Sequence, residues 1–137
     1  MVRAIMHGCN GHMGQVITEL IKNDESIEIV AGIDKYKGIE NDYPVFDSME
    51  ACTEEADVVI DFSNAAAIDA LLDSCKDKKL PVVLCTTGLS EEQLAKVKET
   101  AKETAVLKSA NMSLGINLLL KLLKEATAVL APAGYDM

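Results

Sequence analysis

Gly8-Cys9-Asn10-Gly11-His12-Met13-Gly14 is the stretch that decides the fold. It follows an apolar, strand-like run, Val2–Met6, and it opens a helical pattern over His12–Lys22. Glycines here let the chain turn tightly and approach a pyrophosphate, and free N–H groups at the helix start face the anion. The spacing Gly-x-x-Gly-x-x-Gly is a variant of the dinucleotide fingerprint. A glycine-rich turn without any ligand is the alternative interpretation.

A carboxylate after the second strand separates these two interpretations. Asp34 ends the apolar run Ile27–Ile33 and lies about twenty residues beyond the turn, the interval at which an acid meets the adenosine ribose. The turn and Asp34 together favour binding of NAD or NADP. Lys35 suits the 2′-phosphate of NADP, whereas Asp34 suits the free hydroxyl of NAD, so the pair suggests a site for both. An ordinary solvated loop lysine is an equally good interpretation of Lys35.

Two side chains within the turn have a structural and a functional interpretation. His12 is placed to donate to a pyrophosphate, but a structural role in the first helical turn is favoured. Cys9 lies near a helix N-terminus, where a thiol can become a redox sensor. A buried, inert thiol is the favoured interpretation of Cys9.

Strand-like and helical patterns alternate along the chain, which predicts an α/β fold: a Rossmann-type, doubly wound parallel sheet. Asn64 and Ser90 are expected to cap helices, the latter in a capping box. The predicted strands are Val2–Met6, Ile27–Ile33, Val58–Phe62, Val82–Cys85 and Ala105–Leu107, with a weaker one at Val45–Phe46. The predicted helices between them are His12–Lys22, Ala65–Lys76 and Glu91–Lys102.

Composition narrows the class of protein. A length of 137 residues allows one ordinary core, and a net charge of -9 argues against nucleic acid or an anionic membrane as partner. Four cysteines without a Cys-x-x-Cys pair and only two histidines predict no metal site. The N-terminus lacks the pattern of a signal peptide, so a cytoplasmic protein with reduced thiols is expected.

The segment Leu114–Leu130 is apolar over most of its circumference, and its charges are Lys121, Lys124 and Glu125. It is too charged for a membrane span. A helix with so narrow a polar stripe is normally buried on more than one side. We therefore expect it either to fold back on its own sheet or, preferably, to pair with the same helix of a second copy in a homodimer.

Three further stretches follow predicted strands, where open α/β sheets bind ligands: Asp61-Phe62-Ser63, Cys85-Thr86-Thr87-Gly88 and Ser109 to Asn117. Each is also explained as a turn or cap. With the glycine turn and Asp34-Lys35 they resemble the nucleotide-binding half of the 4-hydroxy-tetrahydrodipicolinate reductase family, over essentially the whole chain. Ser-Ala-Asn-Met-Ser-Leu-Gly-Ile-Asn, from Ser109, is the most specific part of the resemblance.

The resemblance implies a set of cofactor-binding residues for NADH or NADPH. The pyrophosphate would lie on Gly8, Cys9, Asn10, Gly11, His12 and Met13, the adenosine ribose on Asp34, and the 2′-phosphate on Lys35. Phe62, Cys85, Thr86, Thr87 and Ser109, Ala110, Asn111, Met112 would lie along the nicotinamide and its ribose. The chain departs from the family at His12, where Arg or Lys is common, and at Cys85, where Gly is common.

The resemblance also implies a function and its limits. The family reduces a dihydrodipicolinate-type imine with NAD(P)H in the diaminopimelate route to lysine, and the full-length enzyme is expected to be a homotetramer. Its catalytic His and Lys stretch would follow Met137, so no catalytic residue is assigned here. We expect a nucleotide-binding domain at 1–112, a crossover helix with the start of a substrate domain at 113–137, and cofactor binding with little turnover. A homoserine or semialdehyde dehydrogenase, or a non-catalytic nucleotide-sensing module, are the alternatives.

Overall fold

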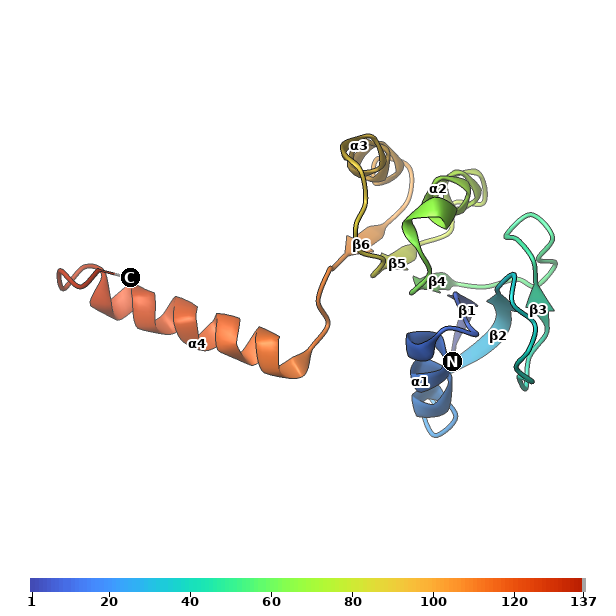
Figure 1. The fold of residues 1–137 in the computed structure, drawn as a ribbon, viewed down its shortest axis with the longest axis horizontal. Coiled ribbons are helices and arrows are strands. Elements are labelled where there is room, and N and C mark those ends of the chain that lie inside the picture. Colours follow the sequence, from blue (N-terminus) through green and yellow to red (C-terminus); the bar gives the residue numbers. More distant parts are fainter. Residues whose placement is uncertain (137) are drawn as a thin grey trace.

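The structure, a computed structural model, describes residues 1–136 and is built on one parallel sheet (Figure 1). The strands lie in the order β3-β2-β1-β4-β5-β6, so the strand order reverses between β1 and β4. This is the Rossmann order, and it confirms the predicted doubly wound fold. The strands are β1 (Val2–His7), β2 (Ile27–Ile33), β3 (Val45–Phe46), β4 (Val58–Asp61), β5 (Val82–Leu84) and β6 (Val106–Lys108).

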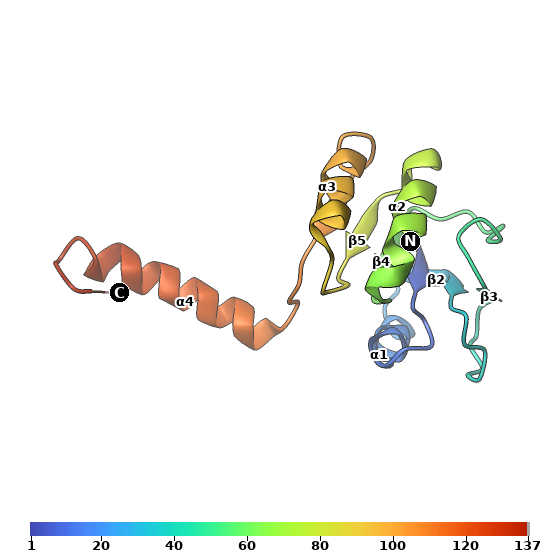
Figure 2. The same cartoon turned by 45° about the horizontal axis from the view of Figure 1, so that its top comes forward.

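Helices cover both faces of the sheet. Helix α1 (His12–Ile21) lies on one face, and α2 (Ile68–Asp77) and α3 (Glu91–Thr100) lie on the other (Figures 1 and 2). A short 3-10 turn, η1 (Ala65–Ala67), precedes α2, and the Asn64 side chain caps it by accepting from the Ala66 N–H. The connections β1-α1-β2 and β4-α2-β5 are therefore the βαβ units that the alternating pattern predicted.

The larger core lies between the sheet and the α2–α3 face. Strand side chains that point to this face pack against the buried side of α2, where burial of each large apolar side chain stabilises the fold by roughly 1.5–3 kcal/mol. Its members include Ile5, Val59, Val82, Leu84, Ile68, Leu71, Leu72, Cys75 and Val97.

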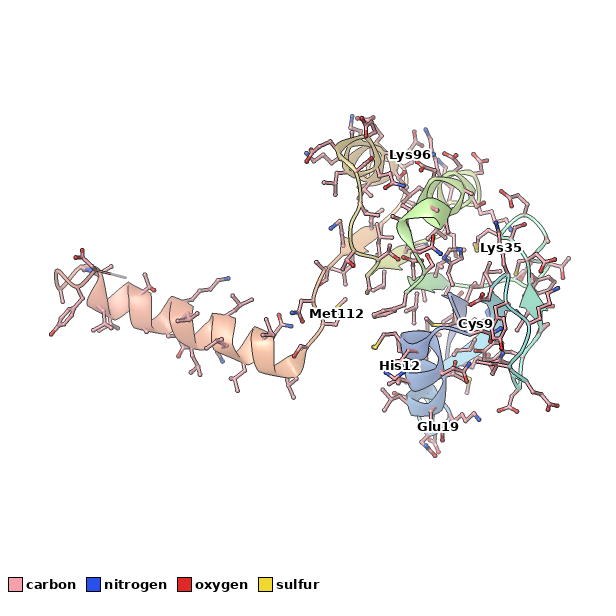
Figure 3. All side chains as sticks on the ribbon, in the orientation of Figure 1. Cys9, His12, Glu19, Lys35, Lys96 and Met112 are labelled. Carbon is pink, nitrogen blue, oxygen red and sulfur yellow. The ribbon has the colours of Figure 1, made fainter. Side chains whose placement is uncertain are left out.

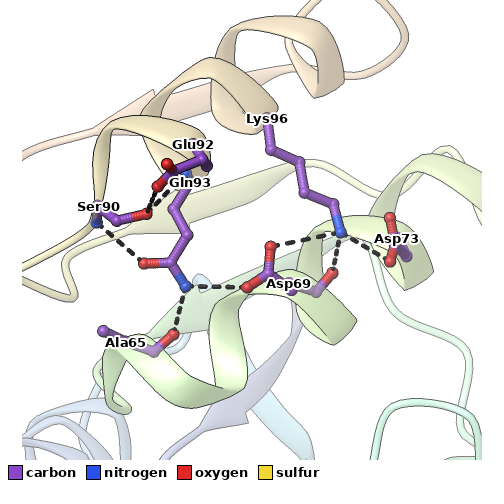
Figure 4. A network of polar contacts seen from close by, with 7 residues as sticks. All are labelled: Ala65, Asp69, Asp73, Ser90, Glu92, Gln93 and Lys96. Atoms are coloured by element: carbon purple, nitrogen blue, oxygen red, sulfur yellow. Dashed lines mark hydrogen bonds and ion pairs between the residues drawn. The ribbon is translucent and has the colours of Figure 1, made fainter.

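Polar contacts hold α2 and α3 side by side above this core (Figure 4). Gln93 of α3 donates to the Ala65 carbonyl at 2.7 Å and to the Asp69 carboxylate at 3.0 Å. One turn further, Lys96 reaches the Asp73 carboxylate at 2.8 Å. Gln93 is also the N3 residue of the predicted capping box, which is present at the start of α3. The same side chain therefore fixes the start of one helix and its position against the next.

The element boundaries differ from the predicted ones by a few residues. The helix predicted from Ala65 begins as η1 and becomes α-helical at Ile68. The strand predicted to end at Phe62 ends at Asp61, because the Asp61 side chain turns the chain by accepting from the Ser63 N–H. Helix and strand ends are set by such caps, which hydropathy patterns do not resolve.

Helix α4 (Leu114–Leu130) matches the predicted range but does not fold back on the sheet, so that alternative is wrong. It extends away from the sheet in both views (Figures 1 and 2), and none of its residues is buried. Its apolar side chains include Leu119, 51% exposed, and Leu123, 48% exposed. Next to it in the chain, β6 carries Leu107, 59% exposed. The structure thus leaves two apolar surfaces uncovered, one on α4 and one on the sheet.

Candidate functional site

A cavity of about 330 Å³ opens at the carboxyl ends of the strands, where the strand order reverses between β1 and β4. Open α/β sheets bind their ligands at this point. The cavity is lined by His7, Gly8, Gly11, Ile33, Asp34, Lys35, Asp47, Phe62, Ser63, Asn64, Ala66 and Ala67. The glycine turn, the residues after β2 and the loop after β4 therefore meet around one space.

The three glycines of the turn have different roles. Gly8 has φ +82°, and a Cβ there would lie 2.7 Å from the Phe62 carbonyl oxygen. A Cβ on Gly14 would lie 2.2 Å from the Gly8 carbonyl oxygen, so both glycines are required by the fold. A Cβ on Gly11 would meet only that oxygen, at 3.3 Å. The fold tolerates a small group at Gly11, and a ligand that approaches the backbone would not.

Asp34 is held at the cavity by the backbone. Its carboxylate accepts from the Asn10 N–H at 3.0 Å and from the Tyr36 N–H at 2.9 Å. The Asn10 side chain in turn donates to the Tyr36 carbonyl oxygen and accepts from Asn41 at 2.8 Å. The turn after β1 and the loop after β2 are thereby joined into one support. Asp34 can accept further hydrogen bonds from a ligand without moving, since each carboxylate oxygen accepts more than one.

Lys35 adds a cation to the same cavity. None of the ion pairs in residues 1–136 involves Lys35, whereas its neighbour Lys37 pairs with Asp47 at 2.9 Å. Figure 3 shows Lys35 on the loop that follows β2, on the same side of the molecule as Cys9 and the turn. The ammonium group of Lys35 is thus available to an anionic ligand group.

A buried polar cluster forms the floor of the cavity. His7 Nδ1 lies 2.7 Å from Asp61 Oδ1, Ser63 Oγ lies 2.6 Å from the same oxygen, and Thr86 Oγ1 lies 2.7 Å from Asp61 Oδ2. Asp61 is fully buried. Burial alone would raise its pKa, but the hydrogen bonds from His7, Ser63 and Thr86 together outweigh burial and lower the pKa of Asp61 below its ordinary value. The carboxylate is therefore ionised at neutral pH, and both of its oxygens accept hydrogen bonds.

Cys9 is a buried thiol within the glycine turn. It is fully buried, and a Cβ on Gly32 of β2 would lie 2.6 Å from its Sγ. Burial, and secondarily the charge of Asp34, raise the pKa of the Cys9 thiol to about 11. Burial also raises the pKa of the Cys85 thiol. The structure favours the inert interpretation of Cys9 over the redox sensor.

The structure brings only part of the predicted site to the cavity. Gly8, Gly11, Asp34, Lys35 and Phe62 line it, whereas Cys9 and Asn10 of the turn are buried and do not line it. The exposed His12 and Met13 form the first turn of α1, and neither lines the cavity.

The remaining predicted residues follow β5 and β6, further along the same sheet edge. Cys85 and Thr86 are buried, and Thr86 turns its hydroxyl inward to Asp61, while Thr87 is exposed. Ser109, Ala110, Asn111 and Met112 connect β6 to α4 and do not line the cavity (Figure 3). Their contact with a cofactor stays a prediction.

Sequence reasoning missed several lining residues, above all His7, together with Asp47 and Asn64, whereas Ser63 belongs to a stretch that was singled out at a strand end. The sequence signal for His7 was its position directly after the predicted strand Val2–Met6, where open α/β sheets bind ligands. Its register pairing with Asp61 in the neighbouring parallel strand is visible only in the fold.

Other features of residues 1–136 point to no competing site. A larger hollow of about 580 Å³ involves Met1 and Ile27, at the opposite ends of the strands and away from the glycine turn. No group of three His, Cys, Asp or Glu side chains in this part of the chain is placed to hold a metal ion. None of its helices combines the length and the hydropathy needed to cross a membrane.

Comparison with known proteins identifies relatives along the whole chain. The 4-hydroxy-tetrahydrodipicolinate reductase of Caldanaerobacter subterraneus subsp. tengcongensis is 50% identical over 137 residues, 100% of this chain and 53% of that protein. The enzyme of the same name from Clostridium novyi is also 50% identical, over 100% of this chain and 54% of that protein. The chain thus spans about half the length of the curated relatives it matches.

Comparison with solved structures gives a similar result. Dipicolinate-bound dihydrodipicolinate reductase from Paenisporosarcina sp. TG-14 has a TM-score of 0.81 at 26% identity, over 94% of this chain and 54% of that chain. A myo-inositol 2-dehydrogenase from Lactobacillus plantarum shares the fold alone, with a TM-score of 0.68 at 13% identity over 91% of this chain and 41% of that chain. The family described as "Dihydrodipicolinate reductase, N-terminus" matches residues 2–112, and the chain belongs to this family.

Proposed function

We propose that this chain binds NADH or NADPH in the cavity at the strand ends, as the nucleotide-binding half of a 4-hydroxy-tetrahydrodipicolinate reductase. The observation that carries the proposal is the open approach to Gly11, opposite a carboxylate, Asp34, that the backbone holds in place. A pyrophosphate needs the open approach to the Gly11 backbone, and an adenosine ribose needs the Asp34 carboxylate. The membership of residues 2–112 in the family supports the same function.

Each part of the cofactor has its own residues in this proposal. The segment Gly8 to Met13 holds the pyrophosphate through backbone N–H groups at the start of α1. Asp34 accepts from the adenosine ribose, and Lys35 pairs with the 2′-phosphate of NADPH. Phe62, Cys85, Thr86 and Thr87, with Ser109, Ala110, Asn111 and Met112, lie along the nicotinamide and its ribose. Cofactor preference is open between NADH and NADPH because both Asp34 and Lys35 line the cavity.

The residues of this chain fit a positioning role in an oxidoreductase. When bound, the cofactor supplies the hydride that reduces a dihydrodipicolinate-type imine in lysine biosynthesis by the diaminopimelate route. The glycine turn and Asp34 fix the adenosine end of the cofactor, and orientation of the reactive end follows from that anchorage. We assign no catalytic acid or substrate ligand to this chain. In this proposal the chain therefore binds cofactor with little or no turnover. Its four free cysteines fit the cytoplasm, where thiols stay reduced.

Calorimetry and an imine-reduction assay test this function together. Titration with NADH and NADPH should give saturable binding of one dinucleotide per chain, and the assay should give no turnover above background. A chain that binds neither cofactor would overturn the proposal. Turnover of a homoserine or aldehyde substrate would instead support another Rossmann oxidoreductase, and cofactor-dependent association without reduction would support a nucleotide-sensing module.

We further propose a division into a nucleotide-binding domain at 1–112 and a second unit at 113–137, which includes α4. Residue 112 precedes Ser113, which caps α4 by accepting from the Ile116 N–H. The side chains of residues 113–136 are almost all exposed, whereas the hydrophobic core cluster lies entirely in the first unit.

The partner of α4 in solution is, in this proposal, a second copy of the chain. Each copy offers an apolar helix face, with Leu119 and Leu123, and an uncovered apolar row on the sheet, with Ile60, Val83 and Leu107. Two copies can cover these surfaces reciprocally, in a symmetric or a swapped dimer. Burial of such side chains at roughly 1.5–3 kcal/mol each gives the driving force.

A further inference from the structure

His7 has an unused hydrogen-bonding group at the cavity. Its imidazole is nearly buried, with 9% of the side chain exposed, and the residue lines the cavity. Nδ1 is paired with Asp61, and Nε2 has no partner in residues 1–136. No side-chain nitrogen or oxygen that is buried in this part of the chain lacks a partner, so Nε2 is open to solvent. The solvent space that His7 lines is the cavity.

Asp61 determines what Nε2 can do. The carboxylate is fully buried and accepts from Ser63 and Thr86 as well as from His7. An ionised carboxylate can only accept, so Nδ1 of His7 must carry the proton. In the neutral ring the second nitrogen, Nε2, is then an acceptor. An acceptor that faces a ligand cavity is paired by a donor on the ligand or by water.

The other residues that line the cavity indicate which part of a ligand lies there. Ala66 and Ala67 of η1 give an apolar wall, and Asp34 follows the neighbouring strand β2. An apolar wall suits a purine base, and a carboxylate suits ribose hydroxyls. A phosphate offers no hydrogen for Nε2 to accept, whereas adenosine offers both an amine and hydroxyl groups.

We propose that His7 is a further ligand-binding residue, whose Nε2 accepts a hydrogen bond from an N–H or O–H donor of the adenosine part of the dinucleotide. Asp61 acts as its positioning residue, because it fixes the tautomer and the orientation of the ring. The inference rests on the proposed function, since it requires that the cavity takes the adenosine end of the cofactor. It extends the site to a residue that the glycine fingerprint does not contain.

NMR of the wild-type chain with ¹⁵N-labelled histidine tests this directly, because the chain has only two histidines. Spectra are recorded at about pH 8, above the pKa of about 6.5 of an unperturbed histidine. His12→Gln assigns the two sets of signals. We expect the Nδ1–H tautomer for His7, and adenosine should move its Nε2 signal while the His12 signals stay in place, since adenosine lacks the pyrophosphate. An Nε2–H tautomer, or an unmoved His7 signal with adenosine bound, would overturn the inference.

Binding measurements locate the donor. His7→Phe keeps the ring and removes both nitrogens, and it should weaken adenosine and NADH about threefold to tenfold, as expected for one hydrogen bond, and leave reduced nicotinamide mononucleotide unchanged. Purine riboside lacks the amine, and 2′-deoxyadenosine lacks one hydroxyl. The compound that His7→Phe binds as well as wild type does identifies the missing donor.

The two proposals fail in different ways. If wild type binds NADH and His7→Phe, shown to be folded by circular dichroism, binds adenosine equally well, only the inference on His7 is wrong. If wild type binds no dinucleotide, both are wrong. The NMR experiment needs no change at His7, so it decides the question even where His7→Phe does not fold.

Discussion

Replacement of Gly11 by Ala separates the needs of the ligand from those of the fold. Gly11 has φ -75° and ψ 167°, which any residue adopts, and its new Cβ would lie 3.3 Å from the Gly8 carbonyl oxygen. A shift of a few tenths of an ångström relieves this contact, and the lower entropy of the unfolded chain offsets part of its cost. We expect the melting temperature of Gly11→Ala to stay within a few degrees of wild type.

Cofactor affinity should respond much more strongly. The methyl group occupies the space where a pyrophosphate approaches the backbone, and loss of one hydrogen bond to a charged phosphate costs about 1.5–3 kcal/mol. This corresponds to a dissociation constant for NADH about 10- to 150-fold higher. The branched side chain of Gly11→Val should abolish measurable binding.

Calorimetry of folded protein, with two matched glycine variants, makes the test specific. Gly115→Ala lies in α4 with no neighbour closer than 3.9 Å, and it should leave affinity unchanged. Gly14→Ala would force a Cβ to 2.2 Å from a backbone oxygen, so it should lower stability by about 1–3 kcal/mol or more. Wild-type affinity for NADH in folded Gly11→Val would refute the assignment of the turn to the pyrophosphate.

Four further predictions follow from the site and the surface. Lys35→Gln should weaken NADPH about tenfold or more and NADH little, because only NADPH carries the 2′-phosphate; equal losses in fluorescence titrations would contradict this. The folded-state pKa of Asp61 lies below the unfolded value of about 3.9, so the ionised carboxylate stabilises the fold above about pH 4. This contribution to stability is lost as pH falls through the folded pKa. In urea unfolding, Asp61→Asn should remove this acid dependence and lower the stability of the chain at pH 7. Leu119→Glu with Leu123→Glu should convert a dimer into a monomer by static light scattering, and a wild type that is monomeric at micromolar concentrations would rule out the dimer. Because the pKa of Cys9 is about 11, iodoacetamide at about pH 8 should modify it only after unfolding, as seen by mass spectrometry.

Local sequence was sufficient for the elements and for the central part of the site. The strand runs, the glycine turn and the interval to Asp34 predicted the order of elements and the position of the cavity, and the structure has both. Such features depend on neighbours in the chain. The spacing of apolar residues indicates which side chains are buried, and a glycine indicates close backbone approach. The length of one βα unit determines where the next strand ends. Ser90 was identified as a helix cap for the same reason.

Tertiary structure alone decided which way the side chains at the strand ends point. The family resemblance implies that Thr86 lies along the cofactor, and only the fold shows that its hydroxyl turns to Asp61, because a buried carboxylate must be paired and Thr86 follows the neighbouring strand. His7 reached the cavity by the same pairing, which joins residues 54 positions apart. Helix α4 was predicted in full from its pattern, but the pattern left open whether the helix folds back on its own sheet, and the structure excludes that alternative. An apolar face requires a cover, and only the arrangement of the whole chain determines whether that cover is its own sheet.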